Sequence, residues 1–189
     1  AEYGILLVRI TGDGYRGVLA ICRYPELLRL EMASTYGVEG ELAGKIASDH
    51  GGYALKQELM AHLKEKGVEF EDIGTYSEAS CNYPEYAERA ARGVAEGKYE
   101  KGILVCGTGI GMSLAANKIP GIRCALLSDC FSAEMCRAHN NANMCALGGR
   151  VTGPELAKRM VDLFLTTEFL GGRHADRVNM ISALENHDR

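Results

Sequence analysis

Residues 102–112 read GILVCGTGIGM, a short apolar run that leads through a cysteine into a loop rich in glycine. The apolar residues before Cys106 are typical of a strand that is buried on both faces, as in a parallel sheet. Residues 113–118 continue as a predicted helix, so the bare N–H groups of Gly107–Gly111 lie at a positive helix terminus. We therefore expect Cys106 at the carboxyl end of a strand, where open α/β sheets place their chemistry.

From residue 45 onward, predicted strands and helices alternate along the chain. Glycine and proline punctuate this part of the sequence, and we expect strands ending at Ser48 and over 68–73, 102–106, 124–128 and 144–148. Helices are expected over 54–66, 84–97 and 113–118, from a cap at Ser132 to His139, over 154–167, and after His174. This order predicts a doubly wound, Rossmann-like α/β fold, with a five-stranded parallel sheet, helices on both faces and a C-terminal helix.

Residues 1–44 do not join this alternation. Segments 4–10 and 18–22 resemble the strands of a hairpin, and residues 25–32 are compatible with a short helix. Gly44 and Lys45 are unusual, because a buried strand is apolar at such positions. We expect residues 1–44 to be an atypical N-terminal extension that is peripheral, disordered or introduced by cloning, and not a second domain.

Composition excludes several classes of protein. The 189 residues carry a net charge of −4 and are 47% hydrophobic, which suits one soluble globular domain. No segment approaches the roughly 20 apolar residues of a membrane helix or resembles a secretory signal, and the acidic balance disfavours nucleic acid as a partner. Seven cysteines without a CxxC pair suggest a reducing compartment, so we predict a cytoplasmic location. No motif indicates a metal, a nucleoside triphosphate or any other cofactor.

Three groups follow predicted strands and are candidates for chemistry. Asp49 and His50 precede two glycines, and their alternative role is a simple helix cap for Asp49. Cys106 is either a base or nucleophile, since a helix terminus favours its thiolate, or a small buried apolar residue. Gly107–Gly111 suits an oxyanion or hydroxyl cradle better than a pyrophosphate, because Met112 stands where a dinucleotide fingerprint needs glycine.

The last third of the chain adds an acid and a cationic clamp. Histidine is the residue type that can exchange a proton near neutral pH, and His139 stands beside Asn140, although Asn140 alone suits a helix C-cap. Arg150 follows the fifth strand, at the same edge as the other strand-end loops. Arg173 and Arg177 share a helix face and can converge on one phosphate, with a solvated basic face as the alternative.

These motifs resemble the ribose-5-phosphate isomerase B family, in the group that includes the galactose-6-phosphate isomerase subunits. The resemblance covers about residues 45–189, which would form a sugar-phosphate isomerase domain, and it rests on SDHGG (48–52), NYPEYA (82–87), CGTGIG (106–111), AANK (115–118), RAHNNAN (137–143), GGRV (148–151) and GGRHADRV (171–178). It implies reversible isomerisation of ribose 5-phosphate and ribulose 5-phosphate through an enediolate, without metal or cofactor. It also implies a homodimer or a dimer of dimers, in which His139 and Cys106 of one shared active site come from different chains.

The resemblance assigns roles by motif. Cys106 would be the base and His139 the ring-opening acid, with Thr108 as a further catalytic residue. The substrate would contact Asp49, His50, Gly107, Thr108, Gly109, Ile110, Gly111 and Asn140. The phosphate would be held by Arg150, Arg173 and Arg177. Some relatives place a glutamate just after the glycine loop, but Met112 stands there in this chain, which leaves Cys106 as the only candidate base.

Other functions remain open on the sequence alone. The same site suits an isomerase for another phosphorylated sugar, such as allose, galactose or tetrulose phosphate. It also suits a non-catalytic sugar-phosphate sensor, or a nucleotide-binding Rossmann protein with Asp129 a strand away from the glycine loop.

Overall fold

The computed structural model describes residues 5–7, 19–21 and 44–185. The chain divides into two compact units, Ala1–Gly40 and Glu41–Arg189. In the first unit, β1 (Ile5–Leu7) pairs antiparallel with β2 (Leu19–Ile21), in agreement with the predicted hairpin. The helix expected over 25–32 lies outside the described residues, and the assignment of 1–44 as an extension stays a prediction.

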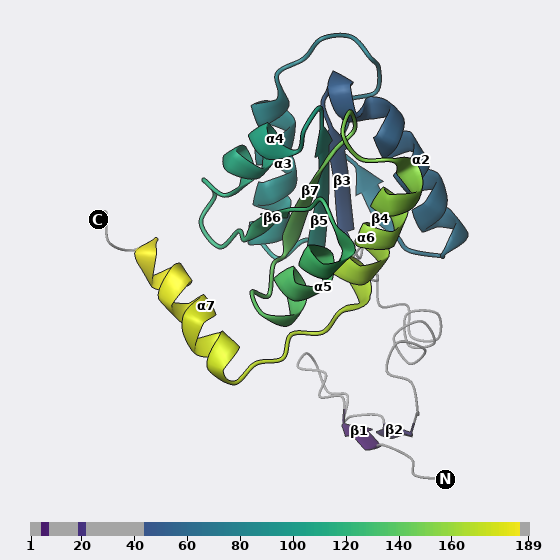
Figure 1. Ribbon diagram of the computed structural model, residues 1–189. Coiled ribbons are helices and arrows are strands. Elements are labelled where there is room, and N and C mark those ends of the chain that lie inside the picture. Colours follow the sequence, from purple (N-terminus) through teal and green to yellow (C-terminus); the bar gives the residue numbers. More distant parts are fainter. Residues whose placement is uncertain (1–4, 8–18, 22–43, 186–189) are drawn as a thin grey trace, which may run out of the picture. The chain divides into compact units, whose positions relative to one another are not determined.

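The second unit contains a five-stranded sheet in the order β4-β3-β5-β7-β6, and each neighbouring pair is parallel. Its strands are β3 (Gly44–Ser48), β4 (Phe70–Asp72), β5 (Lys101–Cys106), β6 (Cys124–Leu126) and β7 (Met144–Gly148). Its helices are η1 (His50–Gly52), α2 (Tyr53–Glu65), α3 (Tyr83–Ala95), α4 (Ile110–Ala116), α5 (Cys130–Ala138), α6 (Pro154–Thr166) and α7 (Arg173–Leu184). The predicted doubly wound, Rossmann-like fold is confirmed (Figure 1).

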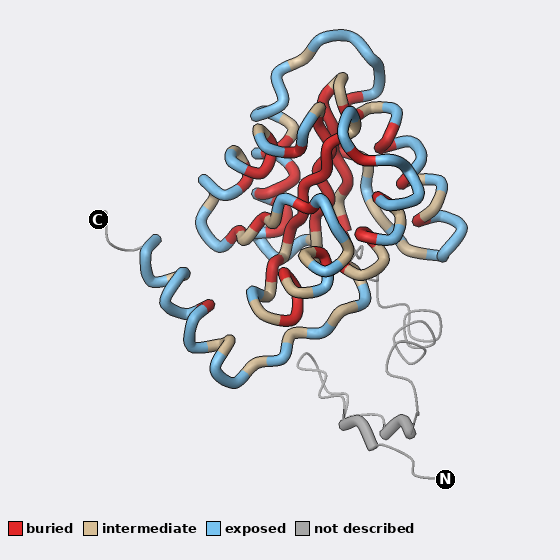
Figure 2. The backbone as a smooth tube through the Cα atoms, viewed as in Figure 1, coloured by how far each residue is buried: buried red, intermediate tan, exposed pale blue. Residues whose placement is uncertain are grey.

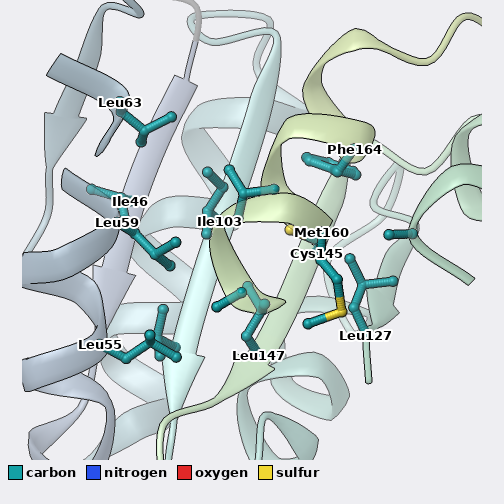
Figure 3. Packing of buried hydrophobic residues seen from close by; sticks show 14 of the residues in the cluster. Ile46, Leu55, Leu59, Leu63, Ile103, Leu127, Cys145, Leu147, Met160 and Phe164 are labelled. Carbon is teal, nitrogen blue, oxygen red and sulfur yellow. The ribbon is translucent and has the colours of Figure 1, made fainter. Parts of the chain in front are cut away.

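Two apolar layers enclose the sheet and set the direction of each strand residue. Helices α2, α5 and α6 cover one face, where Leu59 and Phe164 are fully buried (Figure 3). Helices α3 and α4 cover the other face. Successive side chains of a strand point to opposite faces, so Val105 packs in the first layer and Cys106 in the second. The register of β5 therefore directs the Cys106 thiol toward the side of the sheet that α4 covers.

Two helix boundaries differ from the sequence-based expectation. Helix α5 is capped by Asp129 and not by Ser132: the carboxylate accepts a hydrogen bond from Ser132 N at 2.7 Å, and this bond lowers the pKa of Asp129. Helix α4 begins at Ile110, inside the expected loop, because Gly109 adopts a φ of 81° and starts the first turn there. At its other end, the Asn117 amide donates to the carbonyl oxygens of Ser113 and Cys124 at 2.9 Å each.

The unusual start of the first strand of the sheet has a structural explanation. Gly44 is buried and pairs with both neighbouring strands, so β3 includes both Gly44 and Lys45. The Lys45 ammonium lies 4.1 Å from the ring centroid of Tyr99 and 3.9 Å from the Glu71 carboxylate. A Cβ on Gly93 would stand 2.6 Å from Lys45 Nζ, so this glycine makes room for the side chain. Burial lowers the pKa of Lys45.

A second lysine, Lys56 on α2, is completely buried and braces the loop after β4. Its Nζ donates to Asp72 Oδ1 at 2.5 Å and to the Thr75 carbonyl oxygen at 2.7 Å. The same loop pairs with the end of β3, because Thr75 N donates to Ser48 O and Ser48 N donates to Gly74 O, each at 2.7 Å. The buried ion pair therefore supports the strand that leads directly into the loop at residue 49.

Replacing Lys56 with methionine removes one partner of this buried pair and leaves the Asp72 carboxylate without its cation. We expect Lys56→Met to lower the free energy of unfolding by about 3–5 kcal/mol. The matched control is Lys64→Met, an exposed position on the same helix, for which we expect a change below about 0.5 kcal/mol. Urea unfolding of both variants measures the difference. Similar losses in the two variants would contradict a structural role for the buried pair.

Candidate active site

Three strand-end loops converge at the carboxyl edge of the sheet. Asp49 N, just after β3, donates to the Val105 carbonyl oxygen at 3.1 Å. Gly149 N, just after β7, donates to the Cys106 carbonyl oxygen at 2.7 Å, and Arg150 N donates to Gly107 O at 3.0 Å. Because β5 lies between β3 and β7, its terminal residues hold the loops on both sides. The structure thus gathers three of the predicted loops around Cys106.

Glycines allow these loops to approach each other closely. A Cβ on Gly52 would overlap the Val105 carbonyl oxygen and stand 2.8 Å from Cys106 N. A Cβ on Gly149 would stand 2.8 Å from the Gly51 carbonyl oxygen. Real Cβ atoms do not approach backbone so closely, so the convergence depends on the absence of side chains.

The Cys106 thiol is 5% exposed and faces the glycine loop. Gly109 N donates a hydrogen bond to Cys106 Sγ at 3.1 Å. An N–H group aimed at sulfur stabilises negative charge there, as a base at this position requires. Three other buried thiols lie in a different environment: burial raises the pKa of Cys124 to about 12 and that of Cys136 to about 11, and it raises the pKa of Cys145 strongly.

Three polar side chains belong to the loops that adjoin the end of β5. Asp49 is 7% exposed, and its Oδ1 accepts a hydrogen bond from Gly52 N at 3.0 Å, so it does cap η1. His50 Nδ1 accepts from Cys81 N at 3.4 Å. The Arg150 guanidinium spans the loops: Nη2 lies 3.4 Å from where Gly51 would carry a Cβ, and Nη1 lies 3.5 Å from the equivalent point on Gly107. The loops next to Cys106 therefore carry a carboxylate, an imidazole and a guanidinium.

Thr108 and Ile110 of the glycine loop are exposed to solvent, whereas Gly109 is buried. Thr108 is exposed, and its Oγ1 accepts a hydrogen bond from Ile110 N at 3.4 Å. The Tyr83 ring covers Gly111, because a Cβ there would stand 2.8 Å from the ring. Sequence analysis assigned no role to Tyr83, although it belongs to the NYPEYA motif.

The remaining predicted residues lie at the opposite edge of the sheet. Helix α5 starts after β6 and runs back to the amino ends of the strands, where His139 and Asn140 follow it and Asn143 O accepts from Gly102 N. Gly102 and Cys106 are the ends of a strand segment that spans about 13 Å. Helix α7, with Arg173 and Arg177, leaves the domain at this same edge (Figure 1). One chain therefore does not bring the predicted acid and base together.

At this amino edge, His139 forms a contact that the sequence did not predict. Its ring stacks on His174, with centroids 4.3 Å apart and an interplanar angle of 4°. Burial lowers the pKa of His174, and the nearby charges of His139, Arg173 and Arg177 lower it further. The GGRHADRV motif that contains His174 was the available signal, but only its arginines received a role.

The described residues include neither a membrane-spanning helix nor a cluster of metal-binding side chains. No helix among them is long and apolar enough to cross a membrane. Within residues 5–7, 19–21 and 44–185, no three His, Cys, Asp or Glu side chains form a group that could hold a metal ion.

Comparisons with known proteins identify the family of this chain. Residues 45–181 match the family described as Ribose/Galactose Isomerase. Ribose-5-phosphate isomerase B of Escherichia coli is 50% identical over 137 residues, which cover 72% of this chain and 92% of the relative. D-erythrulose-4-phosphate isomerase of Pectobacterium atrosepticum is 41% identical over 146 residues, with coverages of 76% and 95%. A solved ribose-5-phosphate isomerase B of Clostridium thermocellum superposes with a TM-score of 0.74 at 48% identity, covering 75% of this chain and 96% of that one.

The chain belongs to the ribose/galactose isomerase family. This finding confirms the resemblance that the motifs indicated and defines the protein as an isomerase enzyme.

The close approach at the carboxyl edge is testable by adding a single methyl group. We expect Gly52→Ala to lower the free energy of unfolding by about 2–3 kcal/mol, because the Cβ overlaps the Val105 carbonyl. Gly153→Ala is the matched control: its φ of −67° suits alanine, and no atom lies within 4 Å of the added Cβ. Its cost is limited to a weaker helix cap, below about 1 kcal/mol. Chemical denaturation distinguishes the two, and an unaffected Gly52→Ala protein would contradict the packing.

Proposed function

We propose that this protein interconverts ribose 5-phosphate and ribulose 5-phosphate by proton transfer between C1 and C2. One observation carries the proposal: the Cys106 thiol receives the Gly109 N–H at 3.1 Å, at an edge that also holds Asp49 and Arg150. The names of the E. coli and C. thermocellum relatives support ribose 5-phosphate as the substrate.

In this mechanism Cys106 moves the proton. With the sugar in its open form, the Cys106 thiolate removes the proton from C2, and the electron pair of that bond forms the enediolate while the C1 carbonyl oxygen takes up negative charge. The thiol then returns a proton to C1. Protonation of O1 and loss of the O2 proton complete the ketose, so the reaction consumes no other reactant. A positioned base of this kind contributes about 10²–10⁴-fold to the rate.

The glycine loop stabilises the charged intermediate. Backbone N–H groups of the Gly107–Gly111 loop would donate to the oxygens of an enediolate bound beside Cys106, whose thiol already receives the Gly109 N–H. Donors that are fixed before the reaction contribute about 3–4 kcal/mol each, because they need no reorganisation when the charge develops. Asp49 and His50 hold the sugar hydroxyls in this proposal, and Thr108 donates or accepts at the adjacent oxygen.

Ring opening and phosphate binding require a second copy of the chain. His139 would protonate the ring oxygen, Asn140 would contact a hydroxyl, and Arg173 and Arg177 would hold the phosphate beside Arg150. Since His139 and Cys106 lie at opposite edges of one sheet, we assign these groups to the partner in a homodimer, or a dimer of dimers, that shares its sites.

Exposed apolar side chains support this assembly. Helix α7 is exposed along most of its length (Figure 2), and it presents Met180, Ile181 and Leu184 to solvent. The carboxyl edge exposes another apolar set, formed by Ile110, Leu114, Leu126, Phe131 and Val151. Burial of both sets in one contact would place the basic residues of α7 next to the glycine loop of the partner.

A second substrate is favoured by one observation. The Pectobacterium relative, 41% identical over 146 residues, is named for erythrulose 4-phosphate, so a four-carbon sugar phosphate is the alternative.

The cysteines bear on the location of the protein. All six cysteines in the described part of the chain are free thiols, and we therefore propose a reducing, cytoplasmic location.

The first test is conversion of ribose 5-phosphate by the purified chain in the presence of EDTA. We expect turnover by the wild type, and a loss of about 10²–10⁴-fold in kcat for Cys106→Ala, with substrate binding nearly intact. Cys130→Ala, which changes a half-buried thiol on α5, serves as the control and retains activity. Faster turnover of D-erythrose 4-phosphate would favour the four-carbon alternative, and substrate binding without turnover would make the protein a sensor.

The shared site is tested by complementation between two defective chains. Cys106→Ala and His139→Asn each remove one half of every site, so each homodimer is strongly impaired. Random reassortment produces mixed dimers in which one of the two sites is intact, and activity should recover to about a quarter of the wild-type value. Co-expression followed by a ribose 5-phosphate assay measures the recovery. If each chain forms its own complete site, the mixture stays as inactive as its components.

A further inference from the structure

The loop that follows α5 carries His139 and Asn140, and an arginine from another element holds its backbone. Arg123, just before β6, donates through Nε to the carbonyl oxygens of Asn140 and Asn141 at 3.1 Å each. Its Nη2 donates to the Asn141 carbonyl oxygen at 2.9 Å. The backbone N of Arg123 also donates to Asn143 Oδ1 at 2.8 Å. Arg123 thus contacts the loop at three residues, Asn140, Asn141 and Asn143.

A second arginine holds the same loop from inside. Arg137 is 8% exposed, and its Nη1 donates to Asn141 Oδ1 at 3.0 Å and to the Ala142 carbonyl oxygen at 2.6 Å. Asn141 has a φ of 46°, a left-handed conformation that asparagine tolerates and most side chains do not. The turn after His139 is therefore fixed by backbone conformation and by hydrogen bonds from two guanidinium groups.

The proximity of two positively charged guanidinium groups is electrostatically unfavourable, in contrast to an ordinary surface ion pair. Burial lowers the pKa of Arg123, and the nearby charge of Arg137 lowers it further, while Glu185 opposes both effects. Arg137 Nε is buried without a hydrogen-bond partner among the described residues. Arg123 and Arg137 carry like charges that repel each other across the loop, so mutual charge stabilisation does not explain why both are there. The hydrogen bonds that their guanidinium groups donate to described residues all go to the loop.

The fixed loop also determines where α7 begins. Leu170 N donates to the Ala138 carbonyl oxygen at 3.0 Å, and the His174 ring stacks on His139. At the far end of α7, Glu185 Oε1 accepts from Gly121 N at 2.9 Å, close in sequence to Arg123. The position of the His139 imidazole and the position of α7 therefore depend on the same few residues.

We propose that Arg123 and Arg137 are positioning residues that set the location of the His139 imidazole for ring opening in the site of the partner chain. The inference rests on the proposed isomerase function. Neither arginine touches substrate: both act through the backbone of the loop and through Asn141. Misplacement of a reacting group by about 1 Å can cost about 100-fold in rate, so a loosened loop would impair the step that uses His139.

The kinetic test separates this step from proton transfer at Cys106. Ribulose 5-phosphate is acyclic, because its O5 carries the phosphate, so exchange of its C1 proton with D2O requires Cys106 but no ring opening. We expect Arg123→Met to slow isomerisation of ribose 5-phosphate by about 10–100-fold, while C1 exchange stays within about threefold of the wild type. Arg123→Lys should recover part of the loss. Arg159→Met, at an exposed position of α6, is the control and should change neither rate.

A second variant tests the inner arginine without removing a buried charge. Asn141→Gly keeps the left-handed backbone conformation accessible but deletes the side chain that accepts from Arg137. We expect the same selective loss of isomerisation as in Arg123→Met. A parallel fall of both rates, or no change in either, would overturn the proposal.

Proton NMR of His139 provides a readout that does not depend on activity. In the wild type, the parallel His174 ring at 4.3 Å should shift the His139 carbon-bound ring protons away from free-histidine values. In Arg123→Met these signals should move toward free histidine, while Arg159→Met leaves them unchanged. Unmoved His139 signals in Arg123→Met would overturn the positioning role. A wild-type chain without isomerase activity would instead refute the proposed function, and the NMR comparison would still decide whether Arg123 holds His139.

Discussion

The length of the central strand β5 separates the candidate site residues of this protein into two sets, one at each end of the strands. In a parallel sheet, every strand leads its loops to one edge, and every returning helix ends at the other. Cys106 and Asp49 follow strands, whereas His139 follows a helix, so their separation results from topology and not from the orientation of side chains. Within one domain, the Cys106 thiol and the His139 imidazole therefore lie at opposite ends of the strands. A site that contained both groups would need a second copy of the chain.

The carboxyl edge depends on close backbone packing. The loops after β3 and β7 contact the end of β5 through Gly52 and Gly149, where a methyl group would collide with main-chain atoms. Hydrogen bonds from Asp49 N and Gly149 N to carbonyl oxygens of β5 hold the loops in this position. The amino edge is held differently, by charged side chains that reach carbonyl oxygens. Main-chain contacts therefore hold the end of the strand that carries Cys106, whereas long arginine side chains hold the loop that follows His139.

Much of this architecture was predictable because local and long-range signals agree. The apolar run before Cys106 and the glycines after it predicted a strand end and a tight loop, and Pro154 marked the start of α6. Predictions were wrong where two residues could serve equally well: Asp129 and Ser132 both suit a helix cap, and the charged carboxylate caps α5. Lys45 could not be understood from its own segment, since its ammonium is accommodated by Gly93 and Tyr99, about 50 residues away. The stacking of His139 on His174 was equally invisible, because it joins segments that no periodicity connects.

The burial of several thiols affects the reaction of this protein with electrophiles and oxidants. Only the thiolate reacts quickly with such compounds, and burial raises the pKa of Cys124 and Cys136 to about 12 and 11. Cys145 is shifted in the same direction and is fully buried. Half of the six described thiols are thereby withdrawn from the reactive pool at neutral pH. A cysteine-directed label would discriminate among the described sulfurs of this chain, leaving Cys124, Cys136 and Cys145 unmodified as long as the fold is intact.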